Sequence, residues 1–435
     1  MLIELTKKHK LIIREYLSCL ISLCVYSALV VFLYIKWTVP SYEYFGYTAS
    51  FNLINAIVSF IYLGILSCFL VIQTDNIKAF YVLMIILQVV IPMFCLYTFA
   101  EKFMIFDLYM LMSFSCVIVV SIVGSVRISY ITNLSNVSFS NLFLPLLTIV
   151  TLFTLARYIV LNGLSIFNLD ITKVYDYRLL LRESMTGILA YLDSWTVKVI
   201  NPFCIVYSLY RKNKGLVVFY VTLQVLLFGF SSHKSVLFSA LILVCFFYIT
   251  PFFQRRKWFI IWIFIVACFV PLLLYFKEIS GMWSSIFRRV FFVPATLNFY
   301  YYDYFSQNHF DWFKQSFLRH FVSSSYDLLL PRIIGLEYFG NMEANSNTGF
   351  LGAGYAQGGF LIMIVYSVII GMLINVIAAF CKKLPPGLAV GITILPMSSL
   401  FTSGDLPSSL VTGGLLIALF LLYIMSRDPT ISTID

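Results

Sequence analysis

Apolar stretches of about twenty residues recur along almost the whole chain, and each is long enough to cross the hydrocarbon core of a bilayer as a helix. The sequence predicts about twelve such spans. They lie near residues 17–35, 52–72, 79–99, 104–124, 141–160, 187–210, 215–231, 235–253, 258–276, 359–380, 388–402 and 409–425. We therefore expect an all-α, polytopic integral membrane protein that forms one domain, residues 1–435, with two long loops outside the membrane.

The low charge content excludes an ordinary soluble protein. Only 11% of the 435 residues are charged, whereas roughly a quarter are charged in a typical soluble domain. The net charge of +10 does not indicate nucleic-acid binding, because most basic residues lie at span ends or in the two long loops. Neither metal-ligand spacing nor a Gly-rich phosphate loop is present, and the cysteines lie in or beside apolar spans. We expect no cofactor, no metal and no disulfide framework.

Lysine and arginine are concentrated in the short loops on one side of the expected bundle. These residues include Lys7, Lys8, Lys10, Arg14, Lys78, Arg127, Arg211, Lys214, Arg255, Arg256, Lys257, Lys382, Lys383 and Arg427. Positively charged loops face the cytoplasm, so both termini are predicted to be cytoplasmic. The long loops 161–186 and 277–358 then face outward, into the periplasm of a Gram-negative cell. No small-residue cleavage site follows the first span, so we expect a membrane anchor there.

The loop 277–358 has the features of a folded segment. Apolar residues recur at helical spacing between Phe310 and Phe321, which predicts an amphipathic helix near 310–322. Asn347 and Thr348 precede a helical run that begins near Gly349, so either could cap that helix. A helix N-terminus offers free N–H groups to an anion, although an ordinary capped helix would have the same sequence. Loops held on a rigid scaffold often carry function.

Basic side chains of the outward-facing segments are the first candidates for a binding site. Those that could hold a phosphate or diphosphate group are Arg178, Arg182, Lys234, Arg288, Arg289, Arg319 and Arg332. Guanidinium groups bind phosphate oxygens through paired hydrogen bonds, and basic loops are unusual on the outer face of a membrane protein. The alternative is contact with lipid headgroups or with loop carboxylates such as Asp303 and Asp327. The many aromatic residues of the same loop either form an interfacial belt or stack on sugar rings.

Three stretches of the sequence resemble the Wzy-type O-antigen polymerases of enteric bacteria. They are residues 288–303 (RRVFFVPATLNFYYYD), residues 345–359, which begin NSNTGFLGAGY, and residues 229–238 (GFSSHKSVLF). The resemblance also covers the length of the chain, its number of spans and its large late periplasmic loop.

The resemblance implies a metal-independent glycosyltransferase of the inner membrane that acts at the periplasmic face. Such an enzyme transfers a growing glycan from undecaprenyl diphosphate onto the next lipid-linked repeat unit, without a nucleotide sugar. The implied partners are undecaprenyl-diphosphate-linked oligosaccharides, membrane lipids, and a chain-length regulator and a flippase of the same pathway. The implied fold is an all-helical membrane bundle.

One departure concerns the catalytic base. The related O-antigen ligases carry a histidine just before an asparagine near the end of this loop, where the present chain has Asn345, Ser346 and Asn347. No histidine can therefore be assigned to this role. The candidates for the base are Glu343, which is nearest in sequence, Asp303 and His320, since Asp, Glu and His can all accept a proton.

Two other functions are compatible with a polytopic membrane protein. A flippase or other transporter of lipid-linked oligosaccharides would line its central spans with charge and have short, even loops, whereas charge here is concentrated in two long loops. A polytopic acyltransferase would need a histidine beside a carboxylate within or at the edge of a span, and the sequence has no such pair.

Overall fold

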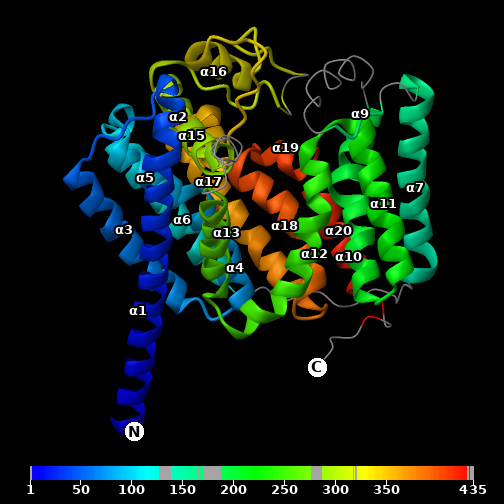
Figure 1. Ribbon diagram of the computed structural model, residues 1–435, viewed down its shortest axis with the longest axis horizontal. Coiled ribbons are helices and arrows are strands. Elements are labelled where there is room, and N and C mark those ends of the chain that lie inside the picture. The colour runs from blue at the N-terminus through cyan, green and yellow to red at the C-terminus, as the bar shows by residue number, and fades with distance from the viewer. Residues whose placement is uncertain are drawn as a thin grey trace. The chain divides into compact units, whose positions relative to one another are not determined.

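A computed structural model of the chain describes residues 2–126, 139–163, 167–170, 188–275, 287–316, 318, 321–428 and 431. These residues form helices, turns and loops without any strand (Figure 1). Where the sequence predicts one domain, the chain divides into two compact units. Unit 1 contains Met1–Arg127, Phe252–Asn375 and Leu400–Leu406, and unit 2 contains Ile128–Pro251, Val376–Ser399 and Pro407–Asp435.

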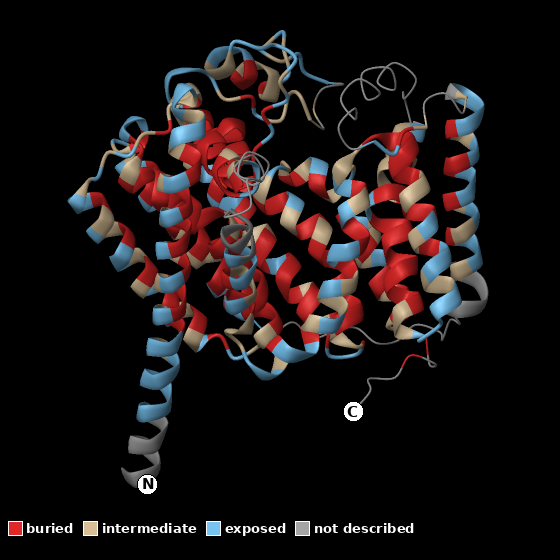
Figure 2. Cartoon of the chain, viewed as in Figure 1, coloured by how far each residue is buried: buried red, intermediate tan, exposed pale blue. Residues whose placement is uncertain are grey.

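Unit 1 contains the N-terminal helices and the helices of the long loop. Its helices are α1 (Leu2–Leu33), α2 (Val39–Tyr42), α3 (Leu53–Ile72), α4 (Asn76–Ile85), α5 (Ile91–Phe99), α6 (Asp107–Ser125), α13 (Phe259–Tyr275), α15 (Val293–Gln307), α16 (Leu330–Phe339) and most of α17 (Phe350–Phe380). The continuous helical run Asn76–Phe99 is its core, because 94% of its most apolar window is buried inside the protein. Helix α3 has a much smaller buried share, 28%, and its exposed apolar face suits contact with lipid (Figure 2).

Unit 2 is built from helices of the middle of the chain and from the C-terminal helices. They are α7 (Phe139–Asn162), α9 (Ile188–Trp195), α10 (Asn201–Tyr210), α11 (Lys214–Ser231), most of α12 (Lys234–Arg255), most of α18 (Pro386–Thr402), most of α19 (Leu406–Leu410) and α20 (Leu415–Met425). Buried amides link three of these helices. Asn201 Nδ2 donates to Gln224 Oε1 over 2.6 Å, and Gln224 Nε2 donates to the Ser239 hydroxyl over 2.9 Å. Such buried polar groups need partners because water does not reach them.

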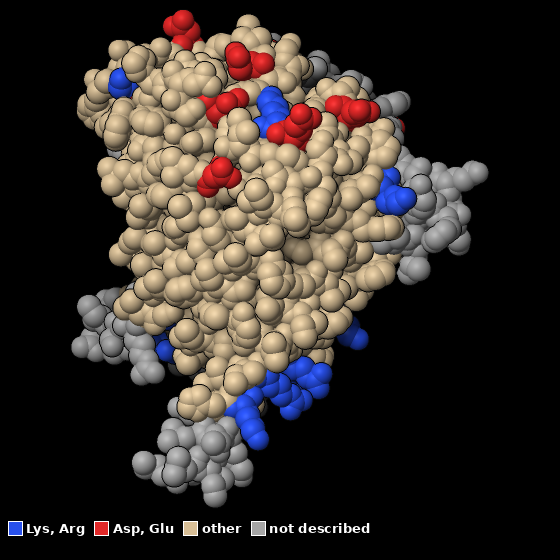
Figure 3. Space-filling model, turned by 90° about the vertical axis from the view of Figure 1, so that its left-hand side faces the viewer, with Lys and Arg blue, Asp and Glu red and all other residues tan. Residues whose placement is uncertain are grey.

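Eight helices of the described chain are long and apolar enough to cross a membrane. Three shorter apolar helices lie at Phe259–Phe269, Pro386–Thr402 and Leu415–Met425. The continuous helical run 188–210, made of α9, the π-helix η6 and α10, coincides with the remaining expected span. Every expected span therefore coincides with a helix, and a polytopic membrane protein is the fold class that these helices support. On the face shown in Figure 3, a broad zone without charged side chains separates charges at two ends.

Four π-helical segments interrupt the described helices, and each is followed by a proline two residues later. The segments are η1 (Tyr34–Thr38), η3 (Ile86–Val90), η6 (Thr196–Ile200) and η7 (Arg288–Phe292), and the prolines are Pro40, Pro92, Pro202 and Pro294. A proline ring clashes with the carbonyl four residues before it in a regular α-helix. A π-turn inserts one extra residue into the helix, which moves that carbonyl and lets the helix continue past the proline.

The predicted amphipathic helix near 310–322 is wrong, because the described residues of this stretch form turns. Trp312 and Phe313 adopt left-handed backbone conformations, with φ of 51° and 65°, which no α-helix contains. Phe310 and Phe313 of this stretch instead pack on Tyr355 and Tyr366 of α17, whereas Phe321 is exposed. The loop instead contains α16, ten residues long, which begins with a proline in its first turn and ends at Gly340 in a left-handed conformation, φ 62°.

Candidate functional site

Helix α15 positions the best-defined group of polar and aromatic side chains in unit 1. Its three consecutive tyrosines point in different directions, since neighbouring residues on a helix are about 100° apart. Tyr300 stacks on Tyr338 of α16, with ring centroids 4.0 Å apart. Tyr301 donates its hydroxyl to the backbone oxygen of Ser346 over 3.1 Å. Tyr302 stacks on Tyr109 of α6, with centroids 4.6 Å apart. The three tyrosines thus bind α15 to α16, to the backbone just before α17, and to α6.

Lys102, Tyr300, Asp303 and Tyr338 form a cluster that we call the tyrosine cluster. The Tyr338 hydroxyl donates to Asp303 Oδ2 over 2.7 Å. The Lys102 ammonium lies 4.5 Å from the centre of the Tyr300 ring and 4.8 Å from that of Tyr338. Burial raises the pKa of Tyr338 and its bond to Asp303 raises it further, while burial lowers the pKa of Lys102 against the opposing effect of Asp303. The cluster combines a carboxylate, a cation and two stacked rings.

Arg288 joins the same aromatic surface. Its guanidinium carbon lies 4.4 Å from the centre of the Tyr42 ring and 4.9 Å from that of Phe45. The carbonyl of Phe45 accepts the Tyr300 hydroxyl at 3.5 Å, so Arg288 and the tyrosine cluster share a neighbour. The buried Nε of Arg288 has no hydrogen-bond partner in the structure. An arginine stacked on rings, with a donor left over, is well suited to bind an oxyanion.

The other predicted arginines of the long loop differ in their surroundings. Arg289, next to Arg288 in the π-helix η7, is exposed. Arg332 lies in the first turn of α16, is partly buried, and has a buried Nε without a hydrogen-bond partner. Arg178, Arg182, Arg319 and His320 lie outside the described residues. The structure therefore brings one of the predicted arginines, Arg288, to the same aromatic surface as the predicted carboxylate Asp303.

The N-terminus of α17 begins at Phe350, close to where the sequence predicts it, but a different residue caps it. Asn298 of α15 accepts the N–H of Gly352 through Oδ1 over 2.8 Å, and Asn298 is fully buried. The Thr348 hydroxyl is buried and has no hydrogen-bond partner. Gly349 packs so closely that a Cβ there would lie 1.9 Å from the carbonyl oxygen of Phe401. The glycines of this motif therefore allow close packing against α15 and the end of α18.

Glu343 and Asn347, two further predicted site residues, are exposed. The backbone N–H of Glu343 donates to Asn341 Oδ1 over 2.9 Å, a local turn that presents its side chain to the outside. Asp303, the other described base candidate, accepts the hydroxyl of Tyr338 of α16, and its charge acts on Lys102, which lies before α6.

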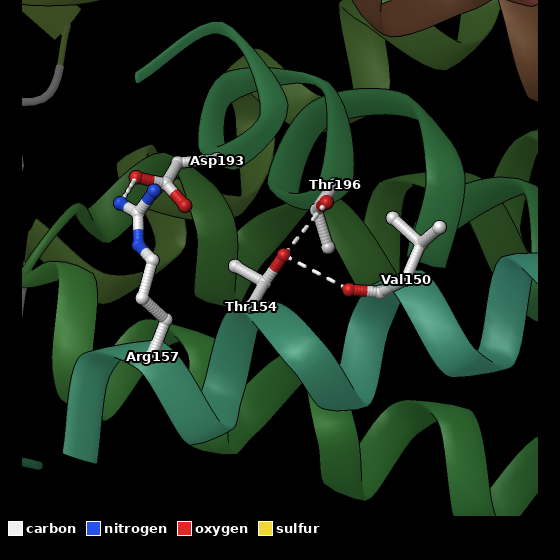
Figure 4. Close-up of polar contacts among 5 residues, drawn as sticks. All are labelled: Val150, Thr154, Arg157, Asp193 and Thr196. Carbon is white, nitrogen blue, oxygen red and sulfur yellow. Dashed lines mark hydrogen bonds and ion pairs between the residues drawn. The ribbon is translucent and has the colours of Figure 1, made fainter. Parts of the chain in front are cut away.

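Unit 2 contains the predicted residue Lys234 and a buried ion pair. Lys234 is the first residue of α12, and it is partly exposed. Arg157 of α7 pairs with Asp193 of α9, and only 10% and 6% of their side-chain surfaces remain exposed. Figure 4 shows the pair beside the Thr154–Thr196 hydrogen bond of 3.1 Å that joins α7 to the π-helix η6. These contacts fix α7 against the helical run 188–210.

Sequence reasoning missed Asp405, which lies in the connection between α18 and α19, outside the membrane-spanning helices. Its Oδ1 accepts the Tyr366 hydroxyl and the N–H of Leu406, each over 2.8 Å. Burial raises the pKa of Asp405 to about 6, and the charge of Asp311 adds to this effect. Asp405 stands in a short Ser-Gly-Asp-Leu-Pro connection with no recognisable motif, so only its tertiary neighbours reveal it.

Among the residues that the structure describes, no group of three or more His, Cys, Asp or Glu side chains is placed to hold a metal ion. Comparison of the whole chain with protein-family models, with curated proteins and with solved structures found no match in any of the three.

Proposed function

We propose that this chain is a membrane glycosyltransferase that polymerises oligosaccharide repeat units carried on undecaprenyl diphosphate, an O-antigen polymerase of the Wzy type. The observation that carries the proposal is the shared surface of Arg288 and the tyrosine cluster. There, a stacked guanidinium with an unused donor lies near buried and half-buried rings, a cation and a carboxylate. A lipid-linked sugar requires such a combination: a cation for the diphosphate, rings for the sugar and a base for the acceptor hydroxyl.

In the proposed reaction, a hydroxyl at the non-reducing end of the acceptor attacks the anomeric carbon of the donor glycan. The bond between that carbon and the diphosphate oxygen breaks, and the diphosphate leaves with the bonding electrons. Arg288 neutralises the charge that develops on it, which is where fixed positive groups contribute most to catalysis. Asp303 accepts the hydroxyl proton. Because diphosphate is already a good leaving group, positioning the two substrates supplies much of the acceleration.

The orientation and compartment are part of the proposal. With both termini in the cytoplasm of a bacterial inner membrane, α15, α16 and the turns after Gln307 face the periplasm. The lower end of the face in Figure 3 shows basic side chains, while the acidic side chains lie towards the opposite end, together with a few basic ones. This distribution fits the positive-inside rule, with the basic end in the cytoplasm. A chain-length regulator and a flippase of the same pathway are the expected partners.

A deletion strain distinguishes the polymerase from the main alternative, a flippase of lipid-linked oligosaccharides. Without a polymerase, lipopolysaccharide should carry a core with a single repeat unit, and the ladder should return on complementation. Without a flippase, the O-antigen would be lost altogether. Purified protein supplied with lipid-linked repeat units in the presence of chelator should extend them. Activity that chelator abolishes and magnesium restores would contradict the metal-independent mechanism.

A further inference from the structure

Lys198 lies near the middle of a helical run that is otherwise buried. The run is 188–210, made of α9, η6 and α10. Between residues 190 and 210, all of which the structure describes, Lys198 is the one exposed residue, and residues 199–208 are all buried. A helical run of this length spans the hydrocarbon core, which places Lys198 near the centre of the membrane. A charged side chain is expensive at this depth, and it faces the interior of the helix bundle or a water-filled cavity rather than lipid.

The pattern of exposure around Lys198 differs from that of a helix that faces lipid. Helix α3 exposes apolar side chains at helical spacing, among them Ile57 and Ile61, which are both 51% exposed. By contrast, no apolar residue is exposed between residues 190 and 210. The residues about one turn before and after Lys198 are polar: Ser194 is partly buried and Asn201 is fully buried. Lys198 therefore reaches an opening that is bounded by protein, where its charge requires water or an ion.

The connection before α20 packs against the same side of this helical run. Ser194 donates its hydroxyl to the backbone oxygen of Thr412 over 2.8 Å, and Trp195 Nε1 donates to that of Val411 over 2.7 Å. Side-chain donors thus satisfy two carbonyl groups of a turn that forms no regular helix. Because Ser194 lies about one turn before Lys198, this connection borders the opening.

The start of α20 is beside Lys198 and lies within the membrane. A Cβ at Gly414 would be 2.6 Å from Cγ2 of Val199, the residue that follows Lys198. The 11 residues of α20 extend over about 16 Å, whereas the hydrocarbon core is about 30 Å thick. Since Arg427, just beyond the other end of α20, belongs at the membrane surface, Gly414 is inside the core. Irregular backbone at this depth is tolerated where it is buried in protein or lines a water-filled cavity. A water-filled opening therefore accounts for both the charge of Lys198 and the irregular backbone beside it.

Lys198 has no ionic partner within the described chain. The structure gives it neither a hydrogen bond nor an ion pair with any residue that it describes. Asp193, the carboxylate nearest to it in sequence, already pairs with Arg157. An anion that enters the opening would neutralise the ammonium group. Thr412, partly exposed in the neighbouring connection, adds a hydroxyl group, and lysine ammonium groups are common ligands of phosphate.

We propose that Lys198 binds a phosphate or diphosphate group in a water-accessible opening of unit 2. A lysine suits this role because its ammonium is a compact charge on a flexible stem, which can follow a phosphate oxygen within the opening. A lipid headgroup and a free anion both present this chemistry, and their affinities distinguish them. That the lipid is a substrate of polymerisation rests on the proposed function, whereas binding of the phosphate group does not.

The first experiment tests whether water reaches position 198. Lys198→Cys in lipid nanodiscs is treated with a charged methanethiosulfonate, which reacts with thiols in water, and the added mass is compared with that of the wild type, whose 9 cysteines set the baseline. We expect one additional label. Phe420→Cys is the matched control, because Phe420 of α20 is 57% exposed but belongs to an apolar helix, and it should add none. An unlabelled Lys198→Cys, or equal labelling of the two variants, overturns the proposal.

The second experiment measures the binding of undecaprenyl diphosphate and of inorganic diphosphate to purified protein in detergent. Lys198→Gln should weaken binding of at least one of them by about tenfold or more, as expected when a charge-assisted contact is lost, while Lys198→Arg should keep most of the affinity. Lys214→Gln, an exposed change at the start of α11 in the same unit, should change nothing. Each variant is also measured together with Arg288→Gln, so that a diphosphate site at Arg288 is counted separately.

The two ligands identify the source of the group. If Lys198→Gln weakens the binding of undecaprenyl diphosphate alone, the group belongs to a lipid; if it weakens both alike, a free anion is sufficient. Affinities for both ligands that Lys198→Gln leaves unchanged overturn the proposal, and so does a loss in Lys198→Arg as large as that in Lys198→Gln. Neither experiment measures polymerisation, so the site at Lys198 and the proposed function stand or fall independently.

Discussion

Arg157 and Asp193 form an ion pair inside unit 2 in which the carboxylate meets a single nitrogen of the guanidinium group. The contact runs from Nη2 of Arg157 to Oδ2 of Asp193, while Nε and Nη1 of Arg157 are buried and have no hydrogen-bond partner. Both side chains are at least nine-tenths buried. Since burying a charge without a partner is expensive, Asp193 is the group that makes the buried position of Arg157 tolerable.

Asp193→Asn is therefore predicted to destabilise unit 2 strongly. Removing one partner of a buried ion pair costs about 3–5 kcal/mol, because the other charge stays behind without compensation. Thermal unfolding of the purified protein in detergent should show a large fall in Tm. The exposed Lys214→Gln in the same unit should leave Tm unchanged.

Replacing both partners tests whether the instability of Asp193→Asn comes from the uncompensated charge of Arg157. The double variant Arg157→Met, Asp193→Leu removes both charges together, and it should be considerably more stable than Asp193→Asn. A double variant as unstable as the single one would show that the pairing does not account for the stability of this contact.

The positions of the helices could be predicted from the sequence, because a stretch of about twenty apolar residues has few alternatives to a helix. The π-helical segments could not, although Pro294 and the three equivalent prolines mark all four of them in the described chain. A proline inside a span is compatible with a kink as well as with a π-turn, so its sequence position alone does not decide between them.

The region near 310–322 was mispredicted for a physical reason. Its apolar spacing is real, but its backbone forms other hydrogen bonds than those of a helix. The carboxylate of the buried Asp311 accepts the N–H of Gln315. The N–H groups of Asp311 and Trp312 donate to carbonyl groups just before the break in α17 at Gly358 and Gly359. The carbonyl groups, which belong to Ala356 and Gln357, are 45 positions away from the residues that bind them, and no local pattern encodes these contacts. For the same reason Asp303 could be chosen as a candidate from its position in a motif, whereas Asp405 became visible only through its tertiary neighbours.

Gly349→Ala is predicted to disrupt the start of α17. A Cβ at this position would lie 1.9 Å from the carbonyl oxygen of Phe401 and 2.5 Å from its carbonyl carbon, so the backbone must move. Overpacking of this kind costs about 1–3 kcal/mol or more, and a lower Tm and a lower protein level in the membrane should show it. Gly64→Ala is the matched control, since its Cβ would meet only the Tyr16 hydroxyl at 3.4 Å and alanine favours the helix. Equal stability of the two variants would contradict the close packing at Gly349.

Asp303→Asn is predicted to lower the polymerisation rate by at least about 100-fold, the usual contribution of a general base. The variant keeps the shape of the side chain and an acceptor for the Tyr338 hydroxyl, so the protein level should stay normal. Tyr338→Phe, which removes the 2.7 Å bond but keeps the ring stack on Tyr300, should have a smaller effect. Glu337→Gln, an exposed change on the same helix, should leave the lipopolysaccharide ladder intact. A normal ladder from Asp303→Asn would exclude Asp303 as the base.

The proposed orientation predicts where reporter fusions are active. A fusion at the exposed Asn308, just after α15, should report the periplasm, and fusions at Arg211 and Arg255 should report the cytoplasm. The assay compares a reporter that is active only in the cytoplasm with one that is active only in the periplasm. A cytoplasmic signal at Asn308 would place the tyrosine cluster on the wrong side of the membrane for a periplasmic polymerase.

Arg288→Lys is predicted to abolish polymerisation, and Arg289→Lys is predicted to be tolerated. The Arg288 guanidinium is stacked on the rings of Tyr42 and Phe45, and it retains an unused donor, whereas Arg289 is exposed. An ammonium group has neither the flat surface for stacking nor the paired donors for a diphosphate, so lysine keeps the charge but loses both interactions. The lipopolysaccharide ladder, compared at equal protein level, measures the effect. If both lysine variants give a normal ladder, the diphosphate is bound elsewhere, and Arg332, with its buried and unpaired Nε, becomes the next residue to test.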